Sequence, residues 1–250
     1  MKIREEAMFL RFSLVIILTV AVLSGGPSTL SADPIIYVDQ TRTTSAIAFV
    51  EDAPDIVFEA NDDTAPDFGP FESLVQANAL LPLTFAHADA SQNSILTDEL
   101  IFASGAANTA AAIDPLDMVS AASTAMTLLD VTFQLEKTFD YQLFSQIGLT
   151  SEGVASSSVL VLLEGPGGVV FSDLLSDVND VSAQFQEGTL GPGLYSFTAV
   201  TEIDSNTVGK GRGSFIVGLI IPEPATATLL TLGALFIIPR RRRRHSVSTQ

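Results

Sequence analysis

Alternating apolar and polar residues are the feature that most restricts what this chain can fold into. Residues 131–136 and 195–199 alternate strictly between the two kinds. A period of two places one set on the buried face of a β-strand and the other in solvent. Residues 159–163 and 215–221 are short continuous apolar runs, which predict central strands covered on both faces. The pattern therefore favours strands in the second half of the chain.

Clusters of glycine and proline separate these segments. We expect turns at residues 165–168, 191–193 and 209–213, which read Gly-Pro-Gly-Gly, Gly-Pro-Gly and Gly-Lys-Gly-Arg-Gly. Strands at short spacing with such turns predict an all-β fold, specifically an antiparallel β-sandwich. Residues 33–221 are enough for one domain of this kind.

The first half of the chain is less decisive. Residues 35–38 and 56–58 predict early strands, followed by an acidic, proline-containing loop over residues 61–70. Residues 106–125 are rich in Ala, Ser and Thr, which suits a helix by propensity and also suits a small-residue strand or loop. An Asp-Pro pair at residues 114–115 interrupts any long helix there.

The first 32 residues have the organisation of a secretory signal peptide. An apolar stretch at residues 12–23 follows three basic residues and precedes a run of small residues that ends at Ala32. We expect export through the Sec translocon and cleavage by signal peptidase between Ala32 and Asp33. An uncleaved anchor helix is the alternative, and initiation at Met8 would give a more typical start than Met1.

Residues 222–250 combine three features in a fixed order. The triplet Pro222-Glu223-Pro224 is followed by the apolar residues 225–238 and then by five arginines. As a transmembrane helix the apolar run would span roughly 21 Å, against about 30 Å for the hydrocarbon core of a bilayer. The prolines keep the helix from beginning before Ala225. The arginines predict a membrane stop with residues 245–250 as a cytoplasmic tail; they are Arg240, Arg241, Arg242, Arg243 and Arg244.

Two other interpretations of this tail exist. Arginine runs are also typical of nuclear-localisation or nucleic-acid patches, and short apolar runs are typical of buried core helices. Neither explains why the triplet, the apolar run and the arginines adjoin one another. We therefore favour membrane targeting, with an anchor that is transient because the apolar run is short.

In order and position, residues 222–244 resemble the C-terminal sorting signal of the PEP-CTERM proteins of Gram-negative bacteria, a motif also labelled an ice-binding protein C-terminal domain. The resemblance implies recognition by an exosortase, an integral-membrane cysteine transpeptidase-like enzyme that cleaves near the triplet. It also implies residence at the cell surface or in the extracellular matrix, often beside exopolysaccharide. Finally, it implies a jelly-roll-like β-ectodomain, which residues 94–150 and 190–195 resemble.

Charge restricts the partners of residues 33–221, the body of the protein. The chain has 12 basic and 29 acidic residues, of which eight basic and three acidic residues lie outside the body. Four basic and 26 acidic residues remain, so the net charge of the body is −22. Such a charge repels nucleic acid and anionic lipid and favours cations and basic or neutral polymers. The sequence has no cysteine, which excludes disulfides, a thiol nucleophile, a cysteine zinc site and a lipoprotein anchor.

The sequence carries no catalytic signature. The Gly-x-Ser-x-Gly elbow, the phosphate-binding loop and the dinucleotide fingerprint do not occur. The two histidines are His87 and His245, and His87 alternates with small apolar residues, as a partly exposed strand histidine does. Acidic pairs are so common in this chain that no pair can be singled out as the two catalytic carboxylates of a glycosidase. A secreted hydrolase is therefore the lowest-ranked function.

Calcium is the one cofactor that the sequence suggests. Two groups of acidic residues fall in predicted loops, and oxygen ligands on loops suit Ca²⁺. Neither group has the order of an EF-hand loop, and a solvated acidic turn without any cofactor is the alternative in both places. The candidate ligands are Asn61, Asp62, Asp63 and Asp67 in the first group and Asp173, Asp177, Asn179 and Asp180 in the second.

The sequence thus predicts an exported, C-terminally sorted protein of the cell surface or extracellular matrix, structural rather than enzymatic. An extracellular carbohydrate- or ice-binding module is the alternative. Ice binding usually uses regular threonine arrays, and only Thr41 and Thr43 show that spacing in the body. Carbohydrate binding favours exposed aromatic platforms, and the chain has three tyrosines and no tryptophan.

Overall fold

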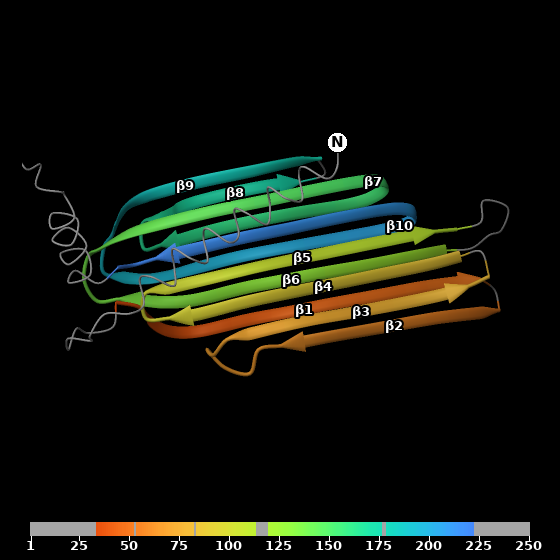
Figure 1. Ribbon diagram of the computed structural model, residues 1–250, viewed down its shortest axis with the longest axis horizontal. Helices are drawn as coiled ribbons and strands as arrows, with labels where there is room; N and C mark the ends of the chain where they lie inside the picture. Colours follow the sequence, from red (N-terminus) through yellow and green to blue (C-terminus); the bar gives the residue numbers. More distant parts are fainter. Residues whose placement is uncertain (1–33, 53, 83, 114–119, 177–178, 223–250) are drawn as a thin grey trace, which may run out of the picture. The chain divides into compact units, whose positions relative to one another are not determined.

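The computed structural model describes residues 34–52, 54–82, 84–113, 120–176 and 179–222, which lie within one compact unit, Asp33–Pro222. These residues are almost entirely β-strand (Figure 1), and every strand pair among them is antiparallel. The expectation of an all-β, antiparallel fold is therefore confirmed. The strands are β1 (Ile36–Asp52), β2 (Asp55–Thr64), β3 (Phe71–Leu81), β4 (Thr84–Thr97), β5 (Leu100–Ala112), β6 (Ser120–Leu135), β7 (Phe139–Gly165), β8 (Gly168–Ser176), β9 (Asp180–Leu190) and β10 (Gly193–Ile220).

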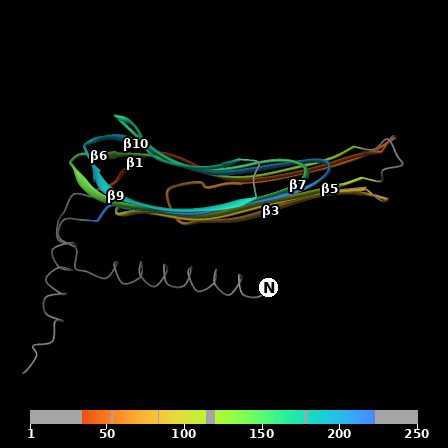
Figure 2. The ribbon, with the colours of Figure 1, turned by 90° about the horizontal axis from the view of Figure 1, so that it is seen from above.

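Two long strands, β7 and β10, join two facing layers of one sheet. The first part of β10 pairs with β6 and its second part pairs with β5, while β7 runs beside β10 along both parts. The first layer therefore has the order β2-β1-β6-β10-β7-β8, and the second layer has the order β3-β4-β5-β10-β7-β9. Figure 2 shows the layers edge-on, with β1 and β6 in one and β3 and β5 in the other. The result is a flattened, nearly barrel-shaped sheet.

The strands β7 and β10 change layers at the same level. Gly153 in β7 and Thr207 in β10 have positive φ values of 73° and 58°, and the register of the two strands shifts between Ser205 and Gly209. Glycine adopts positive φ readily and other residues seldom do, so these residues mark the bends. A Cβ atom at Gly153 would lie 2.4 Å from the carbonyl oxygen of Val208, which leaves room for glycine alone.

The predicted turn at residues 209–213 is wrong, because these residues continue β10 in regular pairing with β5. Their glycines serve packing instead. Beyond the bend, β10 faces its own first part, and a Cβ atom at Gly211 would lie 2.4 Å from Cγ2 of Ile203. Gly213 has the same relation to Cγ2 of Thr201, also at 2.4 Å. The other two predicted turns, between β7 and β8 and between β9 and β10, are confirmed.

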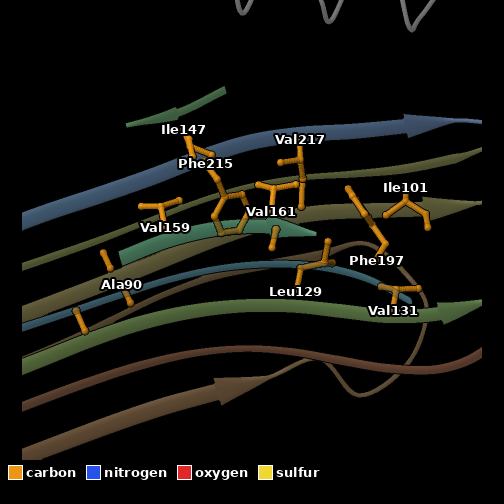
Figure 3. Close-up of a cluster of buried hydrophobic side chains, with 14 of the residues drawn as sticks. Ala90, Ile101, Leu129, Val131, Ile147, Val159, Val161, Phe197, Phe215 and Val217 are labelled. Carbon is orange, nitrogen blue, oxygen red and sulfur yellow. The ribbon is translucent and has the colours of Figure 1, made fainter. Parts of the chain in front are cut away.

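The hydrophobic core is the space between the two layers. Figure 3 shows Val131 and Phe197 from the first layer together with Ile101, Phe215 and Val217 from the second, and all of these side chains are at most 1% exposed. They occupy alternate positions in their strands, as a period of two requires. The predicted early strands are confirmed as the beginnings of β1 and β2.

Two finer expectations are corrected by the burial pattern. Residues 159–163 and 215–221 lie at the centre of the sheet, but only one of their faces is fully buried, and outward residues such as Leu160 and Ile216 are half-buried. Within the described residues no third layer covers the outer faces. Within residues 106–125, the structure shows strand at residues 106–112 and 120–125, where buried alanines with small side chains let the two layers approach closely.

Side chains bridge the edges of the two layers. The amide Nδ2 of Asn61 in β2 donates to the carbonyl of Gln76 in β3 at 2.5 Å. On the opposite side, Nε2 of Gln186 in β9 donates to the carbonyl of Val170 in β8 at 3.2 Å. Each bond satisfies a carbonyl on an edge strand that has no neighbouring strand to pair with. These contacts complete the nearly closed cross-section.

Candidate functional site at the junction of the chain ends

The turn between β4 and β5 holds both ends of the folded body. The amide of Ile35 donates to the carbonyl of Asp98 at 3.1 Å, and the amide of Ile221 donates to the carbonyl of Glu99 at 2.8 Å. The side chains of Ile35 and Ile221 are 2% and 0% exposed. Ile35 and Ile221, which lie near the two ends of the body, are therefore both held by one turn. We call Ile35, Asp98, Glu99 and Ile221 the junction.

Tyr37 fixes the same turn from the side. Its hydroxyl lies 2.6 Å from the carbonyl of Thr97 and 3.3 Å from the carbonyl of Leu100, and its ring stacks on Phe68 at a centroid distance of 5.4 Å. Burial, and then the negative charge of Asp98, raise the pKa of Tyr37, and the hydrogen bond to Thr97 offsets only part of this rise. The hydroxyl therefore stays a neutral donor at physiological pH.

The predicted sorting motif begins directly at the junction. Pro222 is half-buried and follows the buried Ile221 without any intervening residue. The triplet alone separates Ile221 from the predicted helix start at Ala225, and three extended residues span at most roughly 10 Å. The remaining predicted terminal sites lie outside the described residues: Ala32, Asp33, Glu223, Pro224 and the arginines at residues 240–244.

Membrane-spanning segments were expected only near the two chain ends. In the part of the chain that the structure describes, no helix is long and apolar enough to cross a bilayer. The predicted transmembrane helix at residues 225–238 and the apolar stretch of the signal peptide at residues 12–23 both lie outside that part.

The first predicted calcium group is not a loop. Asp62 and Asp63 lie in β2, which pairs with β1 as far as Thr64, so their side chains point to opposite faces of the strand. Asp67 follows in the connection to β3, where its Oδ1 accepts a hydrogen bond from the amide of Gly69 at 2.8 Å. Strand pairing therefore separates side chains that the sequence places close together.

The second predicted calcium group is also dispersed. Asp173 lies in β8 with 4% exposure, and its Oδ2 accepts a hydrogen bond from Oγ of Ser145 at 2.9 Å. Asp180 begins β9, where its Oδ1 accepts from the amide of Val181 at 2.8 Å. Asp177 is outside the described residues. Among those that are described, no three His, Cys, Asp or Glu side chains are grouped so that they could hold a metal ion.

His87 lies on β4 in the partly exposed position that the sequence predicts. Its Nδ1 is 2.7 Å from Oδ1 of Asn78, and its Nε2 is 3.0 Å from Oδ1 of Asp89. Nδ2 of Asn108 donates to the other carboxylate oxygen of Asp89 at 2.7 Å. Both imidazole nitrogens are thus engaged in a polar row across β3, β4 and β5, which suits a structural link between strands.

A shallow hollow of about 210 Å³ lies on the outer face of the first layer. Its titratable groups are the carboxylate of Glu164 and the hydroxyl of Tyr195. That hydroxyl donates to the carbonyl of Gly191 at 2.9 Å, and burial raises the pKa of Tyr195. One carboxylate does not make the acid and base pair of a glycosidase. The lining residues are Thr132, Glu164, Gly165, Leu194, Tyr195 and Ser196.

Comparison with known proteins identifies no family. No protein-family model and no curated protein matches the chain. Among solved structures, the enzymatically active domain of tailspike protein 4 of bacteriophage CBA120 aligns with 60% of this chain at 13% identity and a TM-score of 0.21, and this chain spans only 19% of its length. A structure of infectious bursal disease virus, Gx strain, aligns at 9% identity and a TM-score of 0.20, and the alignment covers 80% of this chain and 75% of the viral chain. Similarities this low carry no functional argument.

Proposed function

We propose that this protein is exported from a Gram-negative-type bacterium, sorted through its C-terminal signal and displayed at the cell surface or in the extracellular matrix, where its role is structural or interactive rather than enzymatic. The observation that carries the proposal is the triplet, apolar run and five arginines at residues 222–244, combined with a signal peptide at residues 1–32. The partners in this proposal are the Sec translocon, signal peptidase, an exosortase and exopolysaccharide.

The geometry of the junction is compatible with this proposal. Because the amides of Ile35 and Ile221 bond to adjacent carbonyls, the described residues near both terminal segments lie on one turn. Enzymes that remove a segment at each end would then act on one side of the body. In the proposal the body is a β-sandwich ectodomain of the jelly-roll-like kind, held transiently at the inner membrane by residues 225–238.

Mass spectrometry of both ends of the mature protein tests the proposal in a Gram-negative host that carries an exosortase. We expect a mature N-terminus at Asp33 and a C-terminus at or near the triplet. Deleting the exosortase should leave the arginines attached and the protein in the membrane fraction. Deleting residues 222–250 should release the body into the medium, because the body then has no anchor.

Charge variants of the tail provide the control. Replacing all five arginines by lysine keeps the positive charge, and we expect sorting to continue because the membrane stop depends on charge. Replacing them by glutamine should impair retention. An intact C-terminus in the exosortase-positive host would show that the tail is only an anchor and not a processed signal. An intact N-terminus would contradict export with cleavage.

A second candidate function, binding of carbohydrate, is favoured by one observation. Three phenylalanines lie in a single outward row on the second layer, which supplies an aromatic surface without tyrosine or tryptophan. Ice binding has no corresponding support. Among the described residues, Thr41 and Thr43 are the only two threonines separated by a single residue.

A further inference from the structure

Apolar side chains form one continuous row across the outer face of the second layer. Strand register places Ile95 of β4 opposite Phe102 of β5, and Phe102 opposite Gly218 of β10. Gly218 is opposite Phe144 of β7, which in turn is opposite Phe185 of β9. Directly opposed residues in antiparallel strands share a face. We call these five residues the phenylalanine row.

Gly218 keeps the phenylalanine row flat. A Cβ atom at this position would lie 2.1 Å from Cε1 of Phe144, so the ring of Phe144 occupies the space above β10 that a side chain would need. The rings of Phe102 and Phe144 are consequently only 6.4 Å apart between centroids, although their strands are separated by β10. Glycine within a strand often marks such a close approach.

The phenylalanine row is open to solvent at both ends. Phe185 is 63% exposed and Ile95 is 40% exposed, whereas Phe102 and Phe144 between them are half-buried. Large outward aromatic side chains on a sheet face without a covering layer are typical of interaction surfaces. The row therefore has the accessibility that a binding surface needs.

Uncharged polar groups flank the phenylalanine row. Gln142 and Gln146 stand on either side of Phe144 along β7, and both point outward. Two outward rows lie beside the phenylalanine row on the same five strands, and the structure describes every residue in them. Glu187 is the one charged residue in these two rows. They are Asn93, Ser104, Ile216, Gln146 and Ala183 on one side, and Thr97, Leu100, Ile220, Gln142 and Glu187 on the other. A nearly neutral surface on a body of net charge −22 is a local exception.

We propose that the phenylalanine row binds a neutral polysaccharide. The C–H face of a pyranose ring is apolar and packs flat on an aromatic ring, and its hydroxyl groups bond to amide and hydroxyl side chains such as those of Gln142, Gln146 and Ser104. A row that crosses several strands suits a linear polymer, which contacts successive rings with successive sugars. The proposal rests on the proposed function only for placing this face outside the cell.

Charge argues against other occupants of the phenylalanine row. A second copy of the chain would bring another body of net charge −22, and the two copies would repel. Anionic polymers and anionic lipid are repelled in the same way. A neutral bilayer surface is usually engaged through tryptophan, tyrosine and basic side chains, none of which occurs in the row or in the two rows beside it.

Affinity electrophoresis of the full chain tests this binding directly. The chain is kept soluble in a polyoxyethylene detergent, which contains no sugar, and is run through gels containing hydroxyethyl cellulose, a β-1,3-glucan, a galactomannan or anionic alginate. We expect retardation by at least one of the three neutral polymers and none by alginate. Phe185→Ala and Phe102→Ala should each weaken binding about tenfold, the order expected for one lost aromatic contact.

Phe58→Ala is the matched control. Phe58 is 61% exposed, like Phe185, but lies on β2 at the edge of the first layer, so its loss should leave binding unchanged. Phe185→Ala removes a side chain from an exposed edge strand, and thermal melting checks that each variant remains folded. Three outcomes would overturn the proposal: no retardation by any neutral polymer, undiminished retardation of the Phe102→Ala/Phe185→Ala double variant, or row-dependent binding only to phosphatidylcholine vesicles or to a second copy. Because the assay uses purified chain, its failure leaves sorting untouched.

Discussion

At the scale of single residues, Arg42 is the largest of the fully buried side chains. Its Nε donates to Oε1 of Gln40 at 2.7 Å and its Nη1 to Oγ of Ser94 at 3.1 Å, while Nη2 bonds to the carbonyl of Asp67. The guanidinium also lies 5.7 Å from the centroid of the Phe71 ring. Burial lowers the pKa of Arg42, and the charge of Asp67 opposes that effect. Arg42 thus ties the connection between β2 and β3 to the core.

Tyr37 makes the stability of the body sensitive to alkaline pH. Because the pKa of Tyr37 is raised in the folded state, an unfolded chain, whose tyrosines ionise near pH 10, loses this proton first. The stabilisation is therefore constant below about pH 10 and falls as the pH rises further. Tyr37→Phe should lose about 1 kcal/mol at pH 8 through its missing hydrogen bond and decline less steeply above pH 10. Urea unfolding at pH 8, 10 and 11 measures both effects, and parallel declines for the two proteins would contradict the prediction.

At the scale of elements, the bend of β10 depends on glycines that have no side chain to clash with the facing part of the strand, and these glycines do not themselves form a turn. In Gly211→Ala, the new Cβ would lie 2.4 Å from Cγ2 of Ile203. Overpacking of this kind costs typically about 1–3 kcal/mol, so we expect a loss of that size in the free energy of unfolding, measured by urea denaturation. The double variant Gly211→Ala/Ile203→Ala should lose less than the sum of the two single changes, because it removes the clash.

Gly167→Ala is the control for this prediction. A Cβ atom at Gly167 would have no atom within 4 Å, and the free energy of unfolding should change by less than about 0.5 kcal/mol. Equal losses for Gly211→Ala and Gly167→Ala would contradict this account, because the loss at Gly211 would then not come from the contact with Ile203.

The strands illustrate how far local patterns reach. Alternation in β6 and the first part of β10 predicts their inward faces, because a period of two is a property of the strand itself. The glycines at 209–213 have the composition of a turn and lie in a strand, because their role is decided by Ile203 and Thr201 across the core. Asp62 and Asp63 have the composition of a loop and lie in β2, because pairing with β1 continues to Thr64.

At the scale of the whole molecule, like charges oppose folding of the body. The body has four basic and 26 acidic residues. Of the four basic residues, Arg42 is buried, and Lys210 pairs with Glu152 at 2.8 Å on the surface. Salt shortens the range of repulsion to about 10 Å at 0.1 M and to about 3 Å at 1 M. We expect the melting temperature of the full chain to rise by a few degrees between 10 mM and 500 mM NaCl. A flat or falling melting temperature would contradict this account.

Calcium provides the comparison for the salt experiment. If repulsion alone is responsible, CaCl₂ and NaCl at equal ionic strength should raise the melting temperature alike. A clearly larger rise with CaCl₂, beginning at millimolar concentration, would instead indicate a specific site among the acidic residues. The dispersed positions of Asp62, Asp67 and Asp173 favour the first outcome.

The candidate sites, like the strands, differ in how much of them the sequence alone can predict. The predicted sorting motif is contiguous, so residues 222–244 indicate it without any structure. The junction and the phenylalanine row are invisible in the linear sequence, because each brings together residues that are far apart along the chain. Ile35 and Ile221 meet on one turn, and Phe102, Phe144 and Phe185 come from three strands, with Gly218 of β10 lying between two of them.

The sequence by itself determined the class of fold, the inward faces of its strongest strands and two of its turns, and it predicts the terminal segments on which the proposed sorting rests. All of these depend on spacing between near neighbours, where periodicity and turn chemistry act directly. Only the tertiary structure decided that β7 and β10 bend from one layer into the other, that both ends of the body share one turn, and that three phenylalanines share one face. Those features depend on register between distant strands, and register is set by how side chains pack across the core and around the bend rather than by any local pattern.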